Sequence, residues 1–248
     1  MFNKLNINKI GDWIIRLIFT ILFFTFIWGI YSYSNYLGIF NIKTINISGN
    51  SIVSKEEILN QLYLLENESS ISIDISNQQE QVNVLDYVYS SQIYREFPST
   101  IHVSIKERQP MLTMKFSDTT LVMDRTGMLL PFVEQFENNL FLPKTFYKKS
   151  FYTIKDNHVE IKSLYNTLNN VISSYSDLYF NISKVSSINN GMQFITFDDT
   201  NIYIKSEDIE MQMIILKNLE KTLGEHALIS DYSSVDLRIP GQVIVREK

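Results

Sequence analysis

Residues 93–108 read IYREFPSTIHVSIKER and hold the clearest strand pattern in the chain. Ile101, Val103 and Ile105 alternate with polar residues, so one face of this segment is expected to be buried and the other to be wet. Pro98 lacks the backbone donor that a strand ladder needs and belongs in a turn. The stretch therefore predicts two strands joined at Pro98.

A strand, a turn and a helix are predicted in the segment before this hairpin. Ile45 and Ile47 alternate with polar residues and lead to a Ser-Gly-Asn-Ser turn at 48–51, because glycine and asparagine tolerate positive φ. Ser54 and Glu57 then have the spacing of a capping box at a helix start. The apolar face of this helix is formed by Ile58, Leu62 and Leu65.

A second short helix is predicted between that helix and the hairpin. Asn77 followed by Glu80 is a helix start signal, and it precedes Val84, Leu85 and Val88. The order of elements from Ile42 to Glu107 is therefore β-α-α-β-β.

The chain beyond Pro110 predicts a mostly antiparallel sheet with flanking helices. Short apolar segments are separated by turn-forming residues, and two segments have helical spacing. Gly224 is the predicted C-cap of the second helix, and Pro240-Gly241 is the predicted turn before the last strand. The predicted strands are 111–116, 120–123, 128–130, 178–185, 192–197, 201–205, 234–239 and 242–245, and the predicted helices are 159–172 and 207–223.

A membrane anchor is predicted near the N-terminus, where residues 13–33 form an apolar run with a single charge, Arg16. At about 1.5 Å per residue, a helix over this run spans a hydrocarbon core of roughly 30 Å. A cleavable signal peptide is the alternative, but its apolar stretch is shorter and ends in small residues. Tyrosines follow here instead, as in the interfacial belt of a retained helix.

The charges on the two sides of this run predict its orientation. Lys4, Lys9 and Arg16 stand against Asp12 on the N-terminal side, whereas Lys43 is the basic residue that follows the run. The positive-inside rule keeps the N-terminus cytoplasmic and exports the rest. The totals of 22 basic and 27 acidic residues leave the exported part with a net charge of about −7. This balance argues against a nucleic-acid partner, which needs a basic face.

The motifs of the chain resemble those of the FtsQ/DivIB family of bacterial division proteins, which combine a POTRA domain with a β domain. The short head before residue 13 and the lack of a tail after Lys248 make the resemblance closer to FtsQ. The matching segments are Ile45–Asn50, Ser54–Ile58, Asp74, Val88, Tyr94–Ile101, Val103, Glu107–Pro110, Leu121–Gly127 and Val235–Arg238.

This resemblance implies an α+β fold with a single N-terminal transmembrane helix. The expected segments are a cytoplasmic segment at 1–12, the transmembrane helix at 13–33, a POTRA domain at 42–110 and an FtsQ-type β domain at 111–248. It also implies a single-pass protein of the inner membrane with a periplasmic C-terminal domain, located at the division septum. Its implied role is a scaffold that binds FtsB and FtsL and links early and late division proteins.

No catalytic, cofactor-binding or metal-binding residues are predicted. The chain has no cysteine, and His102, His158 and His226 lack ligand spacing. Asp198-Asp199 has the composition of a solvated turn. The protein is therefore expected not to be an enzyme and to have no small-molecule substrate. A membrane-tethered periplasmic enzyme and a POTRA-type chaperone remain the alternative functions.

A sheet edge near the C-terminus is the predicted binding surface. The apolar segment Gln242–Val245 can pair with another chain if it lies at an edge, and its neighbour at 235–239 is the other candidate. An interior position, paired on both sides, is the alternative reading. By resemblance, Arg238 is expected to contact the partner, while Ile239 replaces a family aromatic residue. The guanidinium of Arg238 can bind a partner carboxylate through two parallel hydrogen bonds. The predicted partner-binding residues are Arg238, Ile239, Gln242, Val243, Ile244 and Val245.

Overall fold

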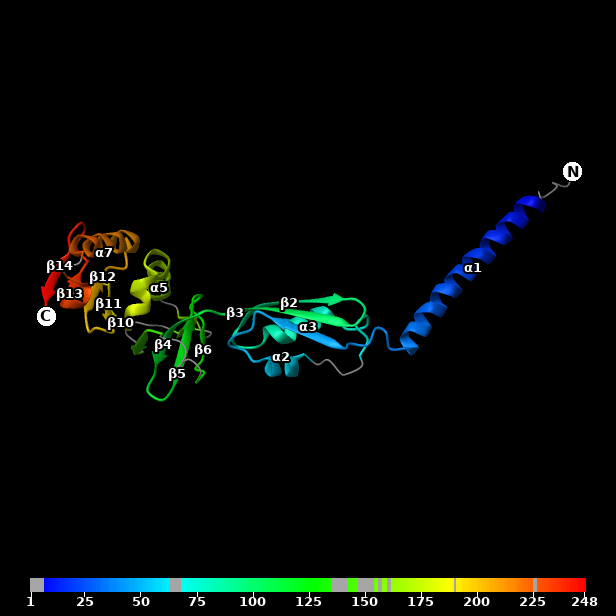
Figure 1. Cartoon of the computed structure of the whole chain (residues 1–248), viewed down its shortest axis with the longest axis horizontal. Helices are drawn as coiled ribbons and strands as arrows, with labels where there is room; N and C mark the ends of the chain where they lie inside the picture. Colours follow the sequence, from blue (N-terminus) through cyan, green and yellow to red (C-terminus); the bar gives the residue numbers. More distant parts are fainter. Residues whose placement is uncertain are drawn as a thin grey trace. The chain divides into compact units, whose positions relative to one another are not determined.

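The computed structural model of the chain consists of two folded units, with the boundary between Glu107 and Arg108 (Figure 1). The first unit comprises Met1–Glu107 and the second Arg108–Lys248. The residues that the structure describes are 7–62, 68–134, 142–146, 154–155, 158–159, 162–189, 191–224 and 227–248.

The first unit begins with the long helix α1, which covers Ile7–Tyr36 and therefore extends the apolar run at both ends. Its segment Gly11–Tyr36 has a mean hydropathy of 2.1, and none of it is buried against the rest of the chain. Among the described residues, α1 is the helix that is long and apolar enough to cross a membrane. Residues 1–6 of the predicted cytoplasmic segment lie outside the described residues.

The predicted β-α-α-β-β order of the first unit is confirmed. Strand β3 lies in the centre of a three-stranded sheet, parallel to β1 and antiparallel to β2. Both short helices lie on one side of this sheet (Figure 1), and the alternating residues Ile101, Val103 and Ile105 of β3 are buried. The elements are β1 (Thr44–Ser48), α2 (Lys55–Gln61), α3 (Ile75–Asn83), β2 (Val88–Glu96) and β3 (Thr100–Glu107).

The first helix start was predicted correctly and the second was not. The Ser54 hydroxyl accepts the backbone N–H of Glu57, as the predicted cap requires. The second helix begins before Asn77, because the Asp74 carboxylate accepts the N–H groups of Ser76 and Asn77 and makes Asp74 the N-cap. This helix ends before Val84, and Val88 belongs to β2. Leu65 lies outside the described residues.

Glu107, at the end of β3, holds the turn that precedes α2. Its carboxylate accepts the backbone N–H groups of Ser51, Ile52 and Val53 at 2.8 to 3.0 Å. The turn therefore has its three successive donors satisfied by one side chain from the end of the neighbouring parallel strand. Gly49 lies directly before this turn, where an added Cβ would stand 2.1 Å from the Ile105 carbonyl oxygen.

The second unit contains a sheet whose described strands follow the order β14-β13-β12-β11-β10-β7-β4-β5-β6. Strand β7 is parallel to both neighbours and β13 is parallel to β12, while the other pairings are antiparallel. The strands are β4 (Pro110–Lys115), β5 (Thr120–Asp124), β6 (Leu129–Pro131), β7 (Lys144–Phe146), β10 (Ile182–Ile188), β11 (Gly191–Thr196), β12 (Asn201–Ile204), β13 (Tyr232–Asp236) and β14 (Ile244–Glu247).

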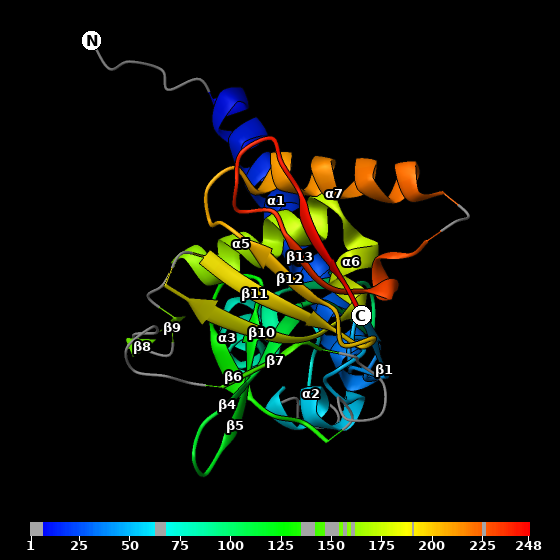
Figure 2. The same ribbon diagram turned by 90° about the vertical axis from the view of Figure 1, so that its left-hand side faces the viewer.

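Three helices lie over the same side of strands β10–β13 (Figure 2), which agrees with the expected sheet with flanking helices. A separate pair of two-residue strands precedes them. The helices are α5 (Lys162–Ser174), α6 (Ser176–Asn181) and α7 (Ile209–Leu223), followed by the short 3-10 helix η1 (Ile229–Asp231), and the separate pair is β8 (Ile154–Lys155) and β9 (His158–Val159).

Several predicted boundaries in the second unit are wrong; the strands predicted at 234–239 and 242–245 lie at Tyr232–Asp236 and Ile244–Glu247, and the helix predicted from 207 begins at Ile209. Residues 178–181 were expected in a strand but form the last four residues of α6. A short apolar run does not distinguish a strand from a helix, and in this helix Leu178 and Tyr179 are buried. The predicted helix 159–172 begins later, at Lys162, since Val159 pairs with Ile154. Residues 160–161 lie outside the described residues. The C-cap at Gly224 is confirmed.

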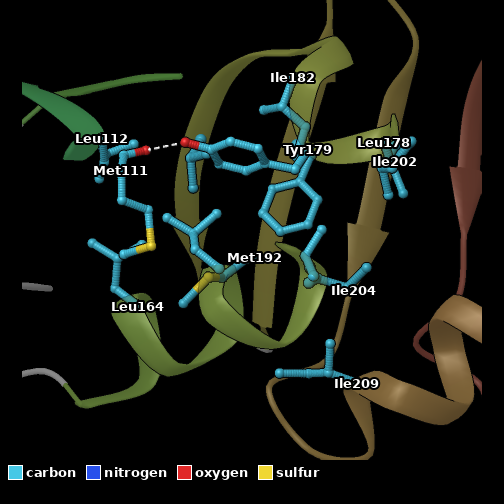
Figure 3. Packing of buried hydrophobic residues seen from close by; sticks show 14 of the residues in the cluster. Met111, Leu112, Leu164, Leu178, Tyr179, Ile182, Met192, Ile202, Ile204 and Ile209 are labelled. Atoms are coloured by element: carbon cyan, nitrogen blue, oxygen red, sulfur yellow. Dashed lines mark hydrogen bonds between the residues drawn. The ribbon is translucent and has the colours of Figure 1, made fainter. Parts of the chain in front are cut away.

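The core of the second unit lies between the sheet and its helices (Figure 3). The Tyr179 hydroxyl donates to the Met111 carbonyl oxygen at 2.8 Å and ties α6 to β4. Burial raises the pKa of Tyr179 to about 12, so this hydroxyl keeps its proton and remains a donor. The fully buried side chains include Met111, Leu112, Leu164, Leu168, Val171, Met192, Phe194, Ile202, Ile204, Met213 and Leu216.

Candidate functional site

The last strand, β14, lies at one end of the order of described strands in the large sheet. It pairs antiparallel with β13, with Val245 opposite Val235 and Ile244 opposite Asp236. In that order it has β13 as its neighbour on one side, and the other side is an edge. Within the described sheet, β14 is therefore not an interior strand paired on both sides. Its neighbour β13, the other candidate for the binding edge, is interior, because it lies between β12 and β14.

A tight turn presents β14 at this edge. After β13 the chain buries Leu237, whose N–H donates to the Tyr203 carbonyl oxygen at 2.9 Å. The Gln242 N–H then donates to the Ile239 carbonyl oxygen, and Gly241 has a φ of 73°. Proline and glycine are the residues that this turn geometry favours at its two central positions. Pro240-Gly241 therefore forms the predicted turn.

The side chains of β14 are exposed, and two of them are large and apolar. Ile244 is 51% exposed and Val245 40%, and Ile239 in the preceding turn is 43% exposed. All four residues of the strand are exposed. An exposed edge strand with apolar side chains offers both backbone hydrogen-bonding groups and contact area to another chain.

Arg238 is bound within its own chain, to Asp236. Its Nε donates to Asp236 Oδ1 at 2.9 Å and its Nη2 to Oδ2 at 2.5 Å. The guanidinium also lies 5.1 Å from the centre of the Tyr203 ring. The hydrogen bond from Arg238 lowers the pKa of Asp236, and the same hydrogen bond raises the pKa of Arg238. Both side chains therefore stay charged at neutral pH.

The two hydrogen bonds between Arg238 and Asp236 are called the fork below. Beside the fork, the face of the sheet that carries no helices is polar, and its side chains are hydrogen-bonded to the chain itself. Gln193 donates to the Asn201 side-chain oxygen at 2.8 Å, and the Asn201 amide donates to the Ser233 carbonyl oxygen at 3.1 Å. Strand alternation places Tyr203 and Asp236 on this same face, opposite the buried Ile202 and Val235. The polar side chains beside Asp236 and Arg238 therefore have hydrogen-bond partners within the chain.

The opposite end of the described sheet is less suited to pairing with another chain. Strand β6 is three residues long and ends in Pro131. Short edge strands and edge prolines are devices that limit edge-to-edge pairing. Of the two ends of the described order, the β14 end is thus the better docking edge.

The predicted partner-binding residues divide between strand and turn. Ile244 and Val245 belong to β14, while Gln242 and Val243 precede it and Val243 packs partly against the core. Arg238 and Ile239 lie in the connection after β13. The prediction that these residues bind a partner stays a prediction.

Three features of the site were missed from the sequence. Asp236 as the partner of Arg238 could have been found, because residues two apart in a strand lie on the same face. Tyr203 could not, because its place beside Arg238 depends on the parallel pairing of β12 with β13. The strand also continues to Glu247, where the Ser233 hydroxyl donates to the Arg246 carbonyl oxygen.

The residues considered for chemistry are dispersed in the described part of the chain. His102 lies beside Glu96 and stacks on the Tyr94 ring at 4.9 Å between ring centres. Asp198 and Asp199 occupy the turn between β11 and β12, with Asp199 at a φ of 62°. Among the described residues, no group of three or more His, Cys, Asp or Glu side chains is placed to hold a metal ion. His226 lies outside those residues.

A family model described as "POTRA domain, FtsQ-type" matches residues 40–108. This match covers the sheet and both helices of the first unit and does not include the β14 edge.

Similar proteins carry both names of one family. The chain is 26% identical over 91 residues to the cell division protein DivIB of Clostridium acetobutylicum, and this match covers 37% of this chain and 36% of the relative. It is 27% identical over 90 residues to the cell division protein FtsQ of Mycolicibacterium smegmatis, covering 36% of this chain and 27% of the relative. With DivIB of Clostridium tetani it shares 21% identity over 174 residues, or 66% of each chain.

The matches thus span about a third of the length of the first relative, about a quarter of the second and about two thirds of the third. FtsQ and DivIB relatives match at nearly equal identity, so a closer relation to FtsQ stays a prediction. The POTRA match and the relatives of both names agree: residues 40–108 match an FtsQ-type POTRA domain, and the chain is similar to cell division proteins named FtsQ and DivIB.

Proposed function

We propose that this protein is a non-catalytic scaffold of bacterial cell division that binds FtsB and FtsL and links early and late division proteins at the septum. The single observation that carries the proposal is the β14 edge, where an exposed apolar strand ends the described sheet. The names of the relatives supply the cellular process.

In the proposed arrangement, α1 anchors the protein in the inner membrane with the N-terminus in the cytoplasm. The anchor is supported by the length and hydropathy of Gly11–Tyr36. The orientation is supported by the excess of basic residues on the N-terminal side. Residues 1–12 would then be cytoplasmic and 13–33 would span the membrane, followed by the POTRA domain at 42–110 and the β domain at 111–248 in the periplasm.

Binding would occur by addition of a partner strand to β14. Backbone N–H and C=O groups at an edge provide affinity, and alternate side chains provide specificity. On β14 these alternate side chains are Ile244 on the face of Asp236 and Val245 on the face of Val235. A partner that pairs with this edge would therefore cover Ile244 on one face and Val245 on the other.

Arg238 would take part as an already ordered charged group. Its fork with Asp236 fixes the guanidinium plane beside the connection to β14. A guanidinium has five donors, of which Asp236 occupies two, so a partner carboxylate could bind the remaining edge without breaking the fork.

The test is capture of FtsB and FtsL by the full chain in membranes. Ile244→Lys places a charge in the proposed contact, and Phe180→Lys is the matched control because Phe180 is 64% exposed on α6, outside the edge strand. We expect Ile244→Lys to lose most of the captured partner and Phe180→Lys to retain it. Equal capture by the two variants would contradict binding at β14.

A further inference from the structure

The end of α1 is locked by backbone hydrogen bonds. The Gly38 N–H donates to the Asn35 carbonyl oxygen at 3.0 Å, and the Ile39 N–H to the Ser34 carbonyl oxygen at 3.1 Å. Gly38 has a φ of 61°. This is a Schellman motif, in which a left-handed residue closes the helix and redirects the chain. The helix therefore ends at Tyr36 with a defined exit.

The chain pairs with the POTRA domain immediately after this exit. The Ser70 N–H donates to the Phe40 carbonyl oxygen at 2.7 Å, and the Lys43 N–H to the Ser99 carbonyl oxygen at 2.9 Å. Asn41 also forms a bridge with Ser69. Four residues separate Tyr36 from Phe40, a reach of at most about 14 Å. The POTRA loops that hold Phe40 and Lys43 must therefore lie close to the end of α1.

Two turns of the POTRA domain meet at this place. The Ser70 hydroxyl donates to the Pro98 carbonyl oxygen at 2.6 Å and ties the turn at 70–72 to the turn at 97–99. Each turn carries an exposed apolar side chain, Ile71 at 40% and Phe97 at 64%. The exit of the helix adds two more, since Leu37 is 52% exposed and Ile39 38%.

The length of α1 puts these side chains at the level of the lipid headgroups. Gly11–Tyr36 contains 26 residues. At about 1.5 Å per residue this is roughly 39 Å, longer than the hydrocarbon core and close to the full thickness of a bilayer with its headgroups. Tyr31, Tyr33 and Tyr36 near its end are residues of the interfacial layer. The turns bound to the next residues lie at that same interface.

We infer that Leu37, Ile39, Ile71 and Phe97 form an apolar tip that inserts into the outer interface of the bilayer that α1 crosses. The occupant is lipid because the tip is continuous with the membrane helix through a few ordered residues. Exposed Lys43 beside it suits the phosphate layer. This inference depends on the anchoring role of α1 in the proposed function and adds a second membrane contact to it.

The test uses the full chain in vesicles and a single tryptophan as a depth probe. The natural tryptophans, Trp13 and Trp28, are replaced by phenylalanine, and Phe97→Trp provides the probe. Tyr89→Trp is the matched control, because Tyr89 is 50% exposed near the start of β2, the strand that leads to the turn holding Phe97. Eight residues of strand separate the two positions by about 26 Å. Ile71→Trp reports from the neighbouring turn.

Flotation with the vesicles is measured first, and quenching by lipids brominated near the headgroup second. We expect the chain to float, the emission of Trp at 97 and at 71 to shift to the blue and be quenched, and that of Trp at 89 to be unaffected. A chain that floats with the probe at 97 unquenched, or with 97 and 89 quenched alike, would overturn the inference and leave the anchor standing. A chain that fails to float would overturn the anchor and the tip together.

Discussion

Asp236 and Arg238 form a bidentate ion pair between residues two apart in the chain, with both carboxylate oxygens bound by the guanidinium. The Arg238 backbone N–H also donates to Asp236 Oδ1, at 3.0 Å. The pair therefore fixes the end of β13 and the start of the connection that leads to β14. A residue expected to bind a partner thus also shapes the edge that would receive it.

Reversing the charge of Arg238 tests its role in binding. Arg238→Glu removes the fork and places a second carboxylate beside Asp236, so we expect capture of FtsB to be lost while circular dichroism stays native. Arg125→Glu is the control, since it makes the same change at an exposed arginine of the same unit. Unchanged capture by Arg238→Glu would refute the role of this residue.

The fork also predicts a dependence of stability on pH. The hydrogen bond from Arg238 lowers the folded-state pKa of Asp236, so its stabilising contribution is present above the unfolded-state pKa. The contribution is lost as the pH falls through the folded-state pKa. Because the pair is partly exposed, we expect about 1 kcal/mol. The free energies of unfolding of the wild type and of Asp236→Asn, measured with urea, should differ by this amount at pH 7. They should become equal at a pH below the folded-state pKa of Asp236.

Glu107 predicts a stability effect in the POTRA domain. Its carboxylate accepts three backbone N–H groups, and hydrogen bonds to charged groups are the stronger ones. We expect Glu107→Gln to lower the free energy of unfolding of the first unit by about 2 kcal/mol. Hydrogen exchange at Ser51, Ile52 and Val53 should accelerate in this variant. Glu56→Gln, at an exposed position of α2, should leave these amides unchanged.

Removal of the POTRA domain should separate binding from location. The two folded units divide between Glu107 and Arg108, so a variant without residues 42–107 keeps the second unit whole. From the family resemblance we propose that the POTRA domain recruits the protein to the division site. We expect this variant to capture FtsB and to lose its concentration at midcell by fluorescence microscopy. Normal localisation would defeat the proposed role of this domain.

Local patterns predicted the elements well where one pattern had one structural meaning. The alternation at Ile101, Val103 and Ile105 gave a strand because its buried side faces helices of the same short segment. The start of α3 was misplaced because Asp74 and Asn77 both have helix-capping side chains, and the structure uses the first. Residues 178–181 were assigned to a strand because a short apolar run fits either structure.

The residues of the candidate site could be predicted from the sequence, but the strands and side chains that surround them could not. The apolar character of Ile244 and Val245 is visible in the sequence, but the end position of β14 depends on the order of strands that are far apart in the chain. The same holds for Tyr203, which meets Arg238 only because β12 and β13 are neighbours. The apolar tip at Phe97 likewise depends on hydrogen bonds between distant turns.

Hydrogen exchange of the β14 amides tests the central proposal most directly. The full chain is measured alone and with FtsB and FtsL, and the amides of Ile244–Glu247 are compared with those of β6 at the opposite end of the described sheet. Strand addition predicts slower exchange in β14 on binding and unchanged exchange in β6. Partner binding with no change in the exchange of β14 would contradict docking at this edge.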